Sequence, residues 1–86
     1  MKVHIPTPLF SYTGNRPVVE VAGASLDEVT RALDREFPGL RFRIIDEQDR
    51  IRPHMRLFVN SDEACALSAE VREGDTVHIV CALSGG

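Results

Sequence analysis

The chain has 86 residues, 43% of them hydrophobic, and a formal net charge of −3 at pH 7. A chain of this length forms one small domain with a single core, and its negative charge disfavours nucleic acid as the main partner, because that role requires a basic face. No hydrophobic run reaches the length of a membrane span and no signal peptide precedes the first predicted strand, so we expect a cytoplasmic protein with no membrane partner.

Two short strands are predicted at the start of the chain. Residues 1–6 alternate hydrophobic and polar side chains, and residues 17–21 are rich in valine, which favours strands. Between them, prolines at positions 6 and 8 lack the N–H that strand pairing needs, and residues 13–15 (Thr-Gly-Asn) form a turn signal. The two strands are therefore expected to form an antiparallel hairpin with a long, irregular connection.

A helix is predicted between Ser25 and Pro38. Ser25 is a favourable N-cap, and Glu28 three residues later completes a capping box, in which both side chains accept backbone N–H groups at the start of the helix. Pro38 and Gly39 end the helix. Hydrophobic residues recur on one face at spacings of three and four, which predicts the face that packs on the core: Leu26, Val29, Leu33 and Phe37.

The second half of the chain predicts two further strands. Residues 40–45 alternate hydrophobic residues with arginine and fit either a strand or a short helical turn. Residues 55–60 form a firm strand, residues 64–71 a loop with one helical turn, and residues 73–75 (Glu-Gly-Asp) a tight turn. The turn leads into a last strand at residues 76–83, where β-branched residues dominate.

The order of these elements predicts the fold. It is an α+β domain in which a mixed sheet of four to five strands packs against one main helix, the ubiquitin-like β-grasp. The last strand is expected in the centre of the sheet, parallel to the first, with a right-handed crossover between them. Residues 1–83 should form this domain and residues 84–86 (Ser-Gly-Gly) a flexible tail, because glycine has no side chain to restrain it.

Short segments spread over the whole chain form a recognisable pattern: residues 3–7 (VHIPT), 13–14 (TG), 57–60 (LFVN), 73–77 (EGDTV) and 84–86 (SGG). This pattern resembles the ubiquitin-like sulfur carriers of the MoaD/ThiS family. Within the family it is most similar to the CysO-like subgroup, which supplies sulfur for cysteine biosynthesis. Residues 63–71 depart from the subgroup in being shorter than it leads us to expect.

The resemblance implies a protein co-substrate and not an enzyme. An adenylyltransferase related to ubiquitin-activating enzymes would use ATP to adenylate the α-carboxylate of Gly86, and sulfide or persulfide would displace AMP to leave a thiocarboxylate. Ser84 and Gly85 would form the thin tail that reaches the partner's active site. The chain has no Gly-x-x-x-x-Gly-Lys-Ser/Thr loop to hold phosphate, so we expect it to bind no cofactor itself.

Further partners follow from the same resemblance. They are a sulfur-accepting synthase of the cysteine synthase type, which can carry pyridoxal phosphate, and a metalloprotease that releases the product. Cysteine is the favoured acceptor, while molybdopterin, thiamine, a thiolated nucleoside and a secondary metabolite remain open. Two other functions also remain open: a ubiquitin-like modifier joined to lysines through Gly86, and an inert β-grasp interaction domain. Lys2 is the only lysine, which nearly excludes chains branched on the protein's own lysines but not single conjugation.

Strand alternation predicts a docking surface. Four hydrophobic residues are expected to face the helix: Leu57, Val59, Val77 and Ile79. Alternation then turns Phe58 and Val80 to the opposite face, where they would form one exposed patch that leads toward the tail. Such a patch indicates a partner surface. The alternative is that a small domain simply cannot cover every hydrophobic side chain.

Other candidate sites have simpler interpretations. The residues that could bind a metal have no close ligand spacing, so no metal site is expected: His4, His54, His78, Cys65 and Cys81. Both cysteines are expected to be free thiols, with Cys81 a small buried hydrophobic residue and Cys65 exposed. The acidic residues 46–49 form a solvated turn and not a paired-carboxylate site, because nothing hydrophobic surrounds them to raise a pKa.

Overall fold

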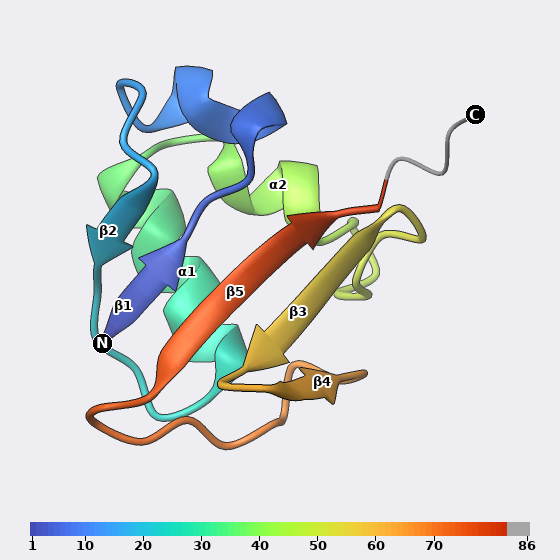
Figure 1. The fold of residues 1–86 in the computed structure, drawn as a ribbon. Coiled ribbons are helices and arrows are strands. Elements are labelled where there is room, and N and C mark those ends of the chain that lie inside the picture. The colour runs from blue at the N-terminus through green and yellow to red at the C-terminus, as the bar shows by residue number, and fades with distance from the viewer. Residues whose placement is uncertain (83–86) are drawn as a thin grey trace.

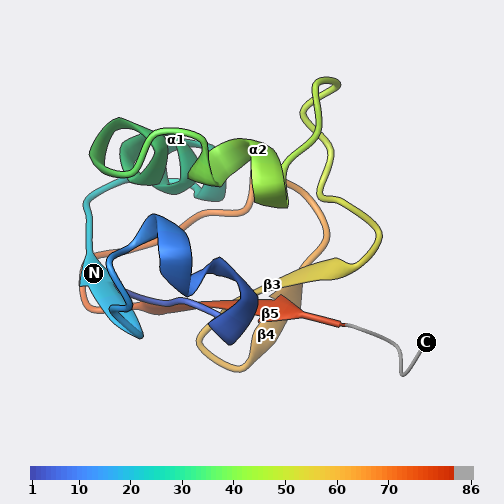
Figure 2. The same cartoon turned by 90° about the horizontal axis from the view of Figure 1, so that it is seen from above.

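The computed structural model describes residues 1–82, which form one sheet covered on one face by helices (Figures 1 and 2). The end of the last predicted strand and the predicted tail lie outside these residues. The elements in chain order are β1 (Lys2–His4), the 3-10 helix η1 (Thr7–Tyr12), β2 (Val18–Glu20), α1 (Leu26–Glu36), α2 (Leu40–Ile44), β3 (Met55–Val59), β4 (Asp62–Ala64) and β5 (Thr76–Cys81). No helix within residues 1–82 has the length and hydrophobicity needed to cross a membrane.

The sheet in the described part of the chain has five strands in the order β2-β1-β5-β3-β4. β5 pairs in parallel with β1 and antiparallel with β3, while β1–β2 and β3–β4 are antiparallel pairs. The prediction that the last strand lies in the centre, parallel to the first, is therefore confirmed. Figure 1 shows β5 crossing the middle of the sheet from one end of the molecule to the other.

The core lies between the sheet and α1, with the predicted residues inside it. Leu26, Val29 and Leu33 on α1 are buried, and they are joined from the sheet by Leu57, Val77 and Ile79. Val59, also predicted to face the helix, packs on the core but is only partly buried. Phe37 is likewise only partly buried, because it caps the helix end instead of continuing the stripe.

The start of α1 is capped nearly as predicted. The backbone N–H of Glu28 donates to the side-chain oxygen of Ser25 at 3.2 Å. The carboxylate of Glu28 reaches back to the N–H of Ala24, at 3.0 Å, one residue further than a standard capping box. The Ser25 oxygen satisfies an N–H group that the first helical turn would otherwise leave unpaired, and the Glu28 carboxylate satisfies the N–H of the residue before the N-cap.

Residues 40–45 illustrate why alternation alone did not determine their structure. They form α2, so Leu40 and Ile44, four positions apart, lie on one face and are fully buried. Phe42, two positions from each, is turned outward with 54% of its surface exposed. In a strand all three side chains would have shared one face.

Arg41 fixes α2 against α1. Its guanidinium donates to the Asp27 carboxylate at 3.1 Å and to the Thr30 hydroxyl at 3.2 Å. Asp27 also accepts from Arg31 at 3.0 Å, and these two arginines, Arg31 first, hold the pKa of Asp27 below its usual value. The position of Phe42 on the surface is therefore set by contacts between two helices.

Two elements were not predicted. The connection expected to be irregular after β1 is the 3-10 helix η1, which begins at the two prolines. The residues after β3 were interpreted as the end of a strand, but they turn back to form β4. Asn60 makes this turn possible with a left-handed backbone (φ 57°), which asparagine adopts more readily than most residues. β4 has an Asp-Glu-Ala sequence with no β-former, so its strand structure comes from pairing with β3.

Candidate functional site

The last described residues lie at the end of β5. β5 ends at Cys81, which is paired with Met55 of β3. The backbone N–H of Ala82 then donates to the carbonyl oxygen of His54 at 2.7 Å. The backbone is thus held against β3 up to the end of the described residues, at the end of the sheet where α2 also lies (Figures 1 and 2). Gly86, Gly85 and Ser84, the predicted reactive tail, follow outside the described residues.

The face of the sheet turned away from α1 carries one row of residues in register across its five described strands. Val18 pairs with His4, His4 with His78, His78 with Phe58, and Phe58 with Glu63. Residues opposite each other on neighbouring strands project from the same face. The His4 and His78 rings stack, with centroids 4.5 Å apart and planes 18° from parallel. We call this surface the outer face.

Phe58 and Val80 both lie on the outer face but not directly opposite each other. Phe58 is opposite His78, whereas Val80 is opposite Arg56. Val80 is 39% exposed and Phe58 is partly buried, and the core-packed hydrophobic residues of 1–82 do not include Phe58. The patch is therefore a diagonal one, interrupted by a histidine and an arginine. Its role in docking stays a prediction.

A second surface lies beside Ala82, the last described residue. Phe42, Arg43, Arg52 and His54 line an open hollow of about 210 Å³. We call it the exit hollow, because His54 is the residue whose carbonyl oxygen binds the N–H of Ala82. Sequence reasoning did not assign it. The helical interpretation of residues 40–45 was the signal that could have found it. In a helix Leu40 and Ile44, four positions apart, share the buried face, and Phe42 is then exposed.

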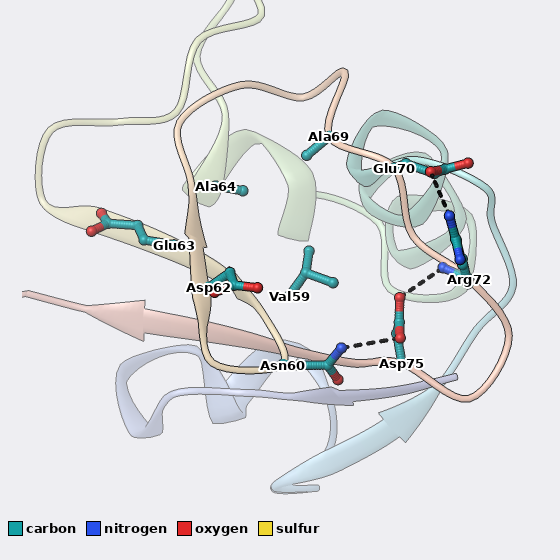
Figure 3. A pocket seen from close by; sticks show the side chains of 9 residues that line it. All are labelled: Val59, Asn60, Asp62, Glu63, Ala64, Ala69, Glu70, Arg72 and Asp75. Atoms are coloured by element: carbon teal, nitrogen blue, oxygen red, sulfur yellow. Dashed lines mark hydrogen bonds and ion pairs between the residues drawn. The ribbon is translucent and has the colours of Figure 1, made fainter.

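The opposite end of β5 borders a different hollow, of about 410 Å³, between the β3–β4 turn and residues 69–75 (Figure 3). Three of the polar residues that line it are linked by hydrogen bonds. Asp75 accepts from the Asn60 side chain at 3.0 Å and from the N–H of Arg72 at 2.9 Å, and the Asn60 oxygen accepts from the N–H of Thr76. The N–H of Arg72, then Asn60, lowers the pKa of the Asp75 carboxyl. We call this surface the distal hollow; its hydrogen bonds hold a loop in place.

Comparison with known proteins identifies the family of this chain. The sequence profile of the ThiS family matches residues 3–86. The chain belongs to the ThiS family. Sulfur carrier protein CysO of Mycobacterium tuberculosis is 29% identical over 89 residues, covering 98% of this chain and 96% of the relative. The resemblance to sulfur carriers drawn from the sequence is confirmed at the level of the family.

Solved structures agree with this assignment. A chain in the crystal structure of the Amycolatopsis orientalis BexX/CysO complex superimposes with a TM-score of 0.92 at 32% identity, covering 99% of this chain and 98% of that one. The crystal structure of M. tuberculosis CysO gives 0.90 at 26% identity, covering 95% and 98%. Small archaeal modifier protein 1 of Haloferax volcanii gives 0.79 at 26% identity, covering 100% and 98%. The predicted β-grasp fold is confirmed.

The remaining candidate residues of this ThiS-family protein have structural roles or none. Within residues 1–82, no three His, Cys, Asp or Glu side chains are arranged to hold a metal ion. Cys65 is exposed, as predicted, whereas Cys81 is only partly buried where full burial was expected. Asp46 accepts from the N–H groups of Gln48 and Arg50, and these contacts, Arg50 first, lower its pKa. The acidic residues 46–49 therefore form a structural turn.

Proposed function

We propose that this protein is a CysO-type sulfur carrier that acts as a co-substrate of other enzymes. The observation that carries the proposal is the family match, which extends through the terminal Gly85-Gly86. Support comes from similarity to CysO sulfur carriers over 98% of the chain. The fold adds a geometric argument: Leu83, Ser84 and the diglycine follow the last sheet-bound residue and reach at most about 14 Å when extended.

The chemistry takes place on the α-carboxylate of Gly86. A carboxylate oxygen attacks the α-phosphorus of ATP and pyrophosphate leaves, which gives a mixed anhydride with AMP. A sulfide or persulfide sulfur then attacks the carbonyl carbon, and AMP leaves with the electron pair of the broken C–O bond. With sulfide the product is a thiocarboxylate directly; a persulfide gives an acyl disulfide that must be reduced. Activation is necessary because a carboxylate is a poor electrophile.

The activating partner is an adenylyltransferase related to ubiquitin-activating enzymes. Since the chain has no phosphate-binding loop, this partner holds ATP. The Amycolatopsis orientalis structure contains CysO in a complex with a second protein, BexX, which supports a mode of action through partner proteins. Phe58 and Val80 on the outer face are the proposed docking residues, because the exposed Val80 on β5 and the partly buried Phe58 on β3 are hydrophobic and favour a covering partner.

Cysteine is the acceptor that we propose, because the sequence resembles the CysO-like subgroup and the chain is similar to CysO sulfur carriers. Transfer would then require a synthase of the cysteine synthase type, with pyridoxal phosphate bound by the synthase, and a metalloprotease to release the extended C-terminus.

The direct test is the intact mass of the protein before and after incubation with the adenylyltransferase of its own host, ATP and sulfide. We expect a mass increase equal to the replacement of one oxygen by sulfur, located on Gly86 by fragmentation. Alkylation with iodoacetamide should label the new C-terminal sulfur even when both cysteines are replaced by serine. No mass change with an enzyme that is active on its other substrates would contradict the proposal.

A second function is favoured by one observation, the similarity to small archaeal modifier protein 1 at 26% identity over the whole chain. In this case Gly86 would be joined to lysine side chains of other proteins. The same mass experiment on protein recovered from its host separates the two functions, because conjugation gives Gly86 isopeptides on target lysines, whereas sulfur loading gives none.

A further inference from the structure

The exit hollow combines an exposed aromatic ring with two arginines. The guanidinium carbon of Arg52 lies 4.5 Å from the centre of the Phe42 ring, and Arg52 Nε donates to the carbonyl oxygen of Phe42 at 2.7 Å. The guanidinium therefore lies over the face of the ring, in a cation–π contact that restrains both groups. Phe42, at 54%, has the highest exposed fraction of the large hydrophobic residues in the described chain. The arrangement is a rigid platform on the surface.

The charge of the exit hollow is opposite to that of the whole chain. The protein has a net charge of −3. The described residues that line the hollow nevertheless include two arginines, Arg43 and Arg52, and no carboxylate. Neither arginine forms an ion pair in the described part of the chain, whereas Arg31, Arg41, Arg56 and Arg72 all do. Two cations that are left without carboxylates beside an exposed ring favour an anionic, partly hydrophobic ligand.

The position of the hollow determines which ligand can reach it. His54 lines the hollow, and its carbonyl oxygen accepts a hydrogen bond from Ala82, the last described residue. A protein that takes Gly86 into its active site must come within about 14 Å of Ala82, which brings its surface near the exit hollow. A ligand that binds only the outer face does not need to lie beside Ala82.

We propose that the exit hollow is a second docking surface, which receives an acidic segment of the enzyme that activates Gly86. The inference rests on the proposed sulfur-carrier function. A carboxylate of the partner pairs with Arg43 and Arg52, while a hydrophobic side chain of the same segment covers Phe42. The outer face and the exit hollow then both bind the partner, near the C-terminal end of β5. Charge pairing at such a site raises the association rate and fixes orientation.

The test compares charge reversals at opposite ends of β5. Arg43→Glu changes the exit hollow, and Arg72→Glu changes the distal hollow by the same amount of charge. Arg72 is a suitable control because its side chain is 79% exposed and pairs only loosely with Glu70, at 3.5 Å. Phe42→Ser removes the hydrophobic part of the platform. Circular dichroism melts should confirm that all three variants are folded.

The measurement is steady-state loading of each full-length variant by the host's adenylyltransferase, with sulfide and ATP saturating. We expect Arg43→Glu to raise KM about tenfold with kcat within a factor of about two, and Arg72→Glu to behave as the parent. The effect of Arg43→Glu should shrink as salt is added, because it is electrostatic. Phe42→Ser should also raise KM, without the salt dependence.

Three results would overturn the inference. Equal KM values for Arg43→Glu and Arg72→Glu would show that only net charge matters. A loss confined to kcat would place Arg43 in the chemical step and not in docking. Sedimentation could instead show that the parent forms salt-sensitive dimers and that Arg43→Glu abolishes them. A second copy of this chain, and not the enzyme, would then occupy the hollow. If the parent itself is not loaded, the proposed function fails and this inference fails with it. If the parent is loaded normally, the results for the variants test the docking inference alone.

Discussion

The two ends of the central strand β5 differ in how their polar groups are satisfied. In the distal hollow, Asn60, Arg72 and Asp75 bind one another and leave a loop fixed in place. In the exit hollow, Arg43 and Phe42 face solvent, with no ion pair to Arg43 among residues 1–82. Groups that a fold pairs internally stabilise it, whereas exposed groups without internal partners are available for recognition. We therefore expect changes at the distal end to affect stability and changes at the exit end to affect binding of the proposed partner.

The strongest test of this division is at the C-terminus. Deleting Gly86, or changing it to Ala, should abolish or nearly abolish sulfur loading, because the reacting carboxylate is displaced or crowded at its adjacent carbon. The melting temperature should stay at the parental value, since the core residues all lie earlier in the chain. Intact-mass assays and thermal melts measure the two effects, and normal loading of the deletion protein would refute the role of Gly86.

The core between the two ends gives the largest expected effect on stability. Ile79 on β5 is buried beneath α1, with 4% of its surface exposed. Ile79→Ala should lower the free energy of unfolding by about 2–4 kcal/mol through lost burial and a cavity. Urea denaturation measures the change. Val80→Ala, one position along on the exposed face, is the matched control and should cost much less; equal costs would mean that the inward face has been misassigned.

The outer face should affect binding and not stability. Phe58→Ser removes a ring that lies outside the core, so we expect the Kd for the adenylating partner to rise about tenfold while the melting temperature changes little. Isothermal titration calorimetry with the partner enzyme measures the affinity. Val18→Ser is the control, because Val18 lies at the far end of the same row. Parental affinity of Phe58→Ser would remove this face from docking.

The distal hollow should show the smallest effect, and it should depend on pH. Because hydrogen bonds lower the folded-state pKa of Asp75 below 3.8, its stabilising contribution is present above that value and is lost as the pH falls through the folded pKa. Asp75→Ala should therefore destabilise the protein near neutral pH and lose less stability than the parent on acidification. Urea midpoints at about pH 7 and about pH 3 test this. Equal losses in the two proteins would contradict it, and loading should be unchanged.

Local signals predicted the parts of the fold that local interactions determine. Ser25 and Glu28 lie near each other in sequence and cap α1, and the period of two along β5 placed Val77 and Ile79 inside. β4 could not be predicted in this way, because its Asp-Glu-Ala sequence forms a strand only through pairing with β3.

The exit hollow was not predictable for a related reason. Phe42 and Arg52 are ten positions apart, and they meet because Ile45 and Ile51 form a bridge that folds the intervening turn back. The outer-face positions of Phe58 and Val80 did follow from alternation. Their interruption by His78 and Arg56 depended on the register between β5 and β3, which the sequence alone does not specify.

The central place of β5 also determines how the domain responds to force. A pull on the C-terminus acts along β5, which is bonded to β1 on one side and β3 on the other, and the bond from Ala82 to His54 continues the second ladder. The load is shared as shear by both ladders, so their hydrogen bonds must break together and not one after another. An edge strand pulled sideways would peel. The domain should therefore resist a pull on its C-terminus better than a domain that ends in an edge strand.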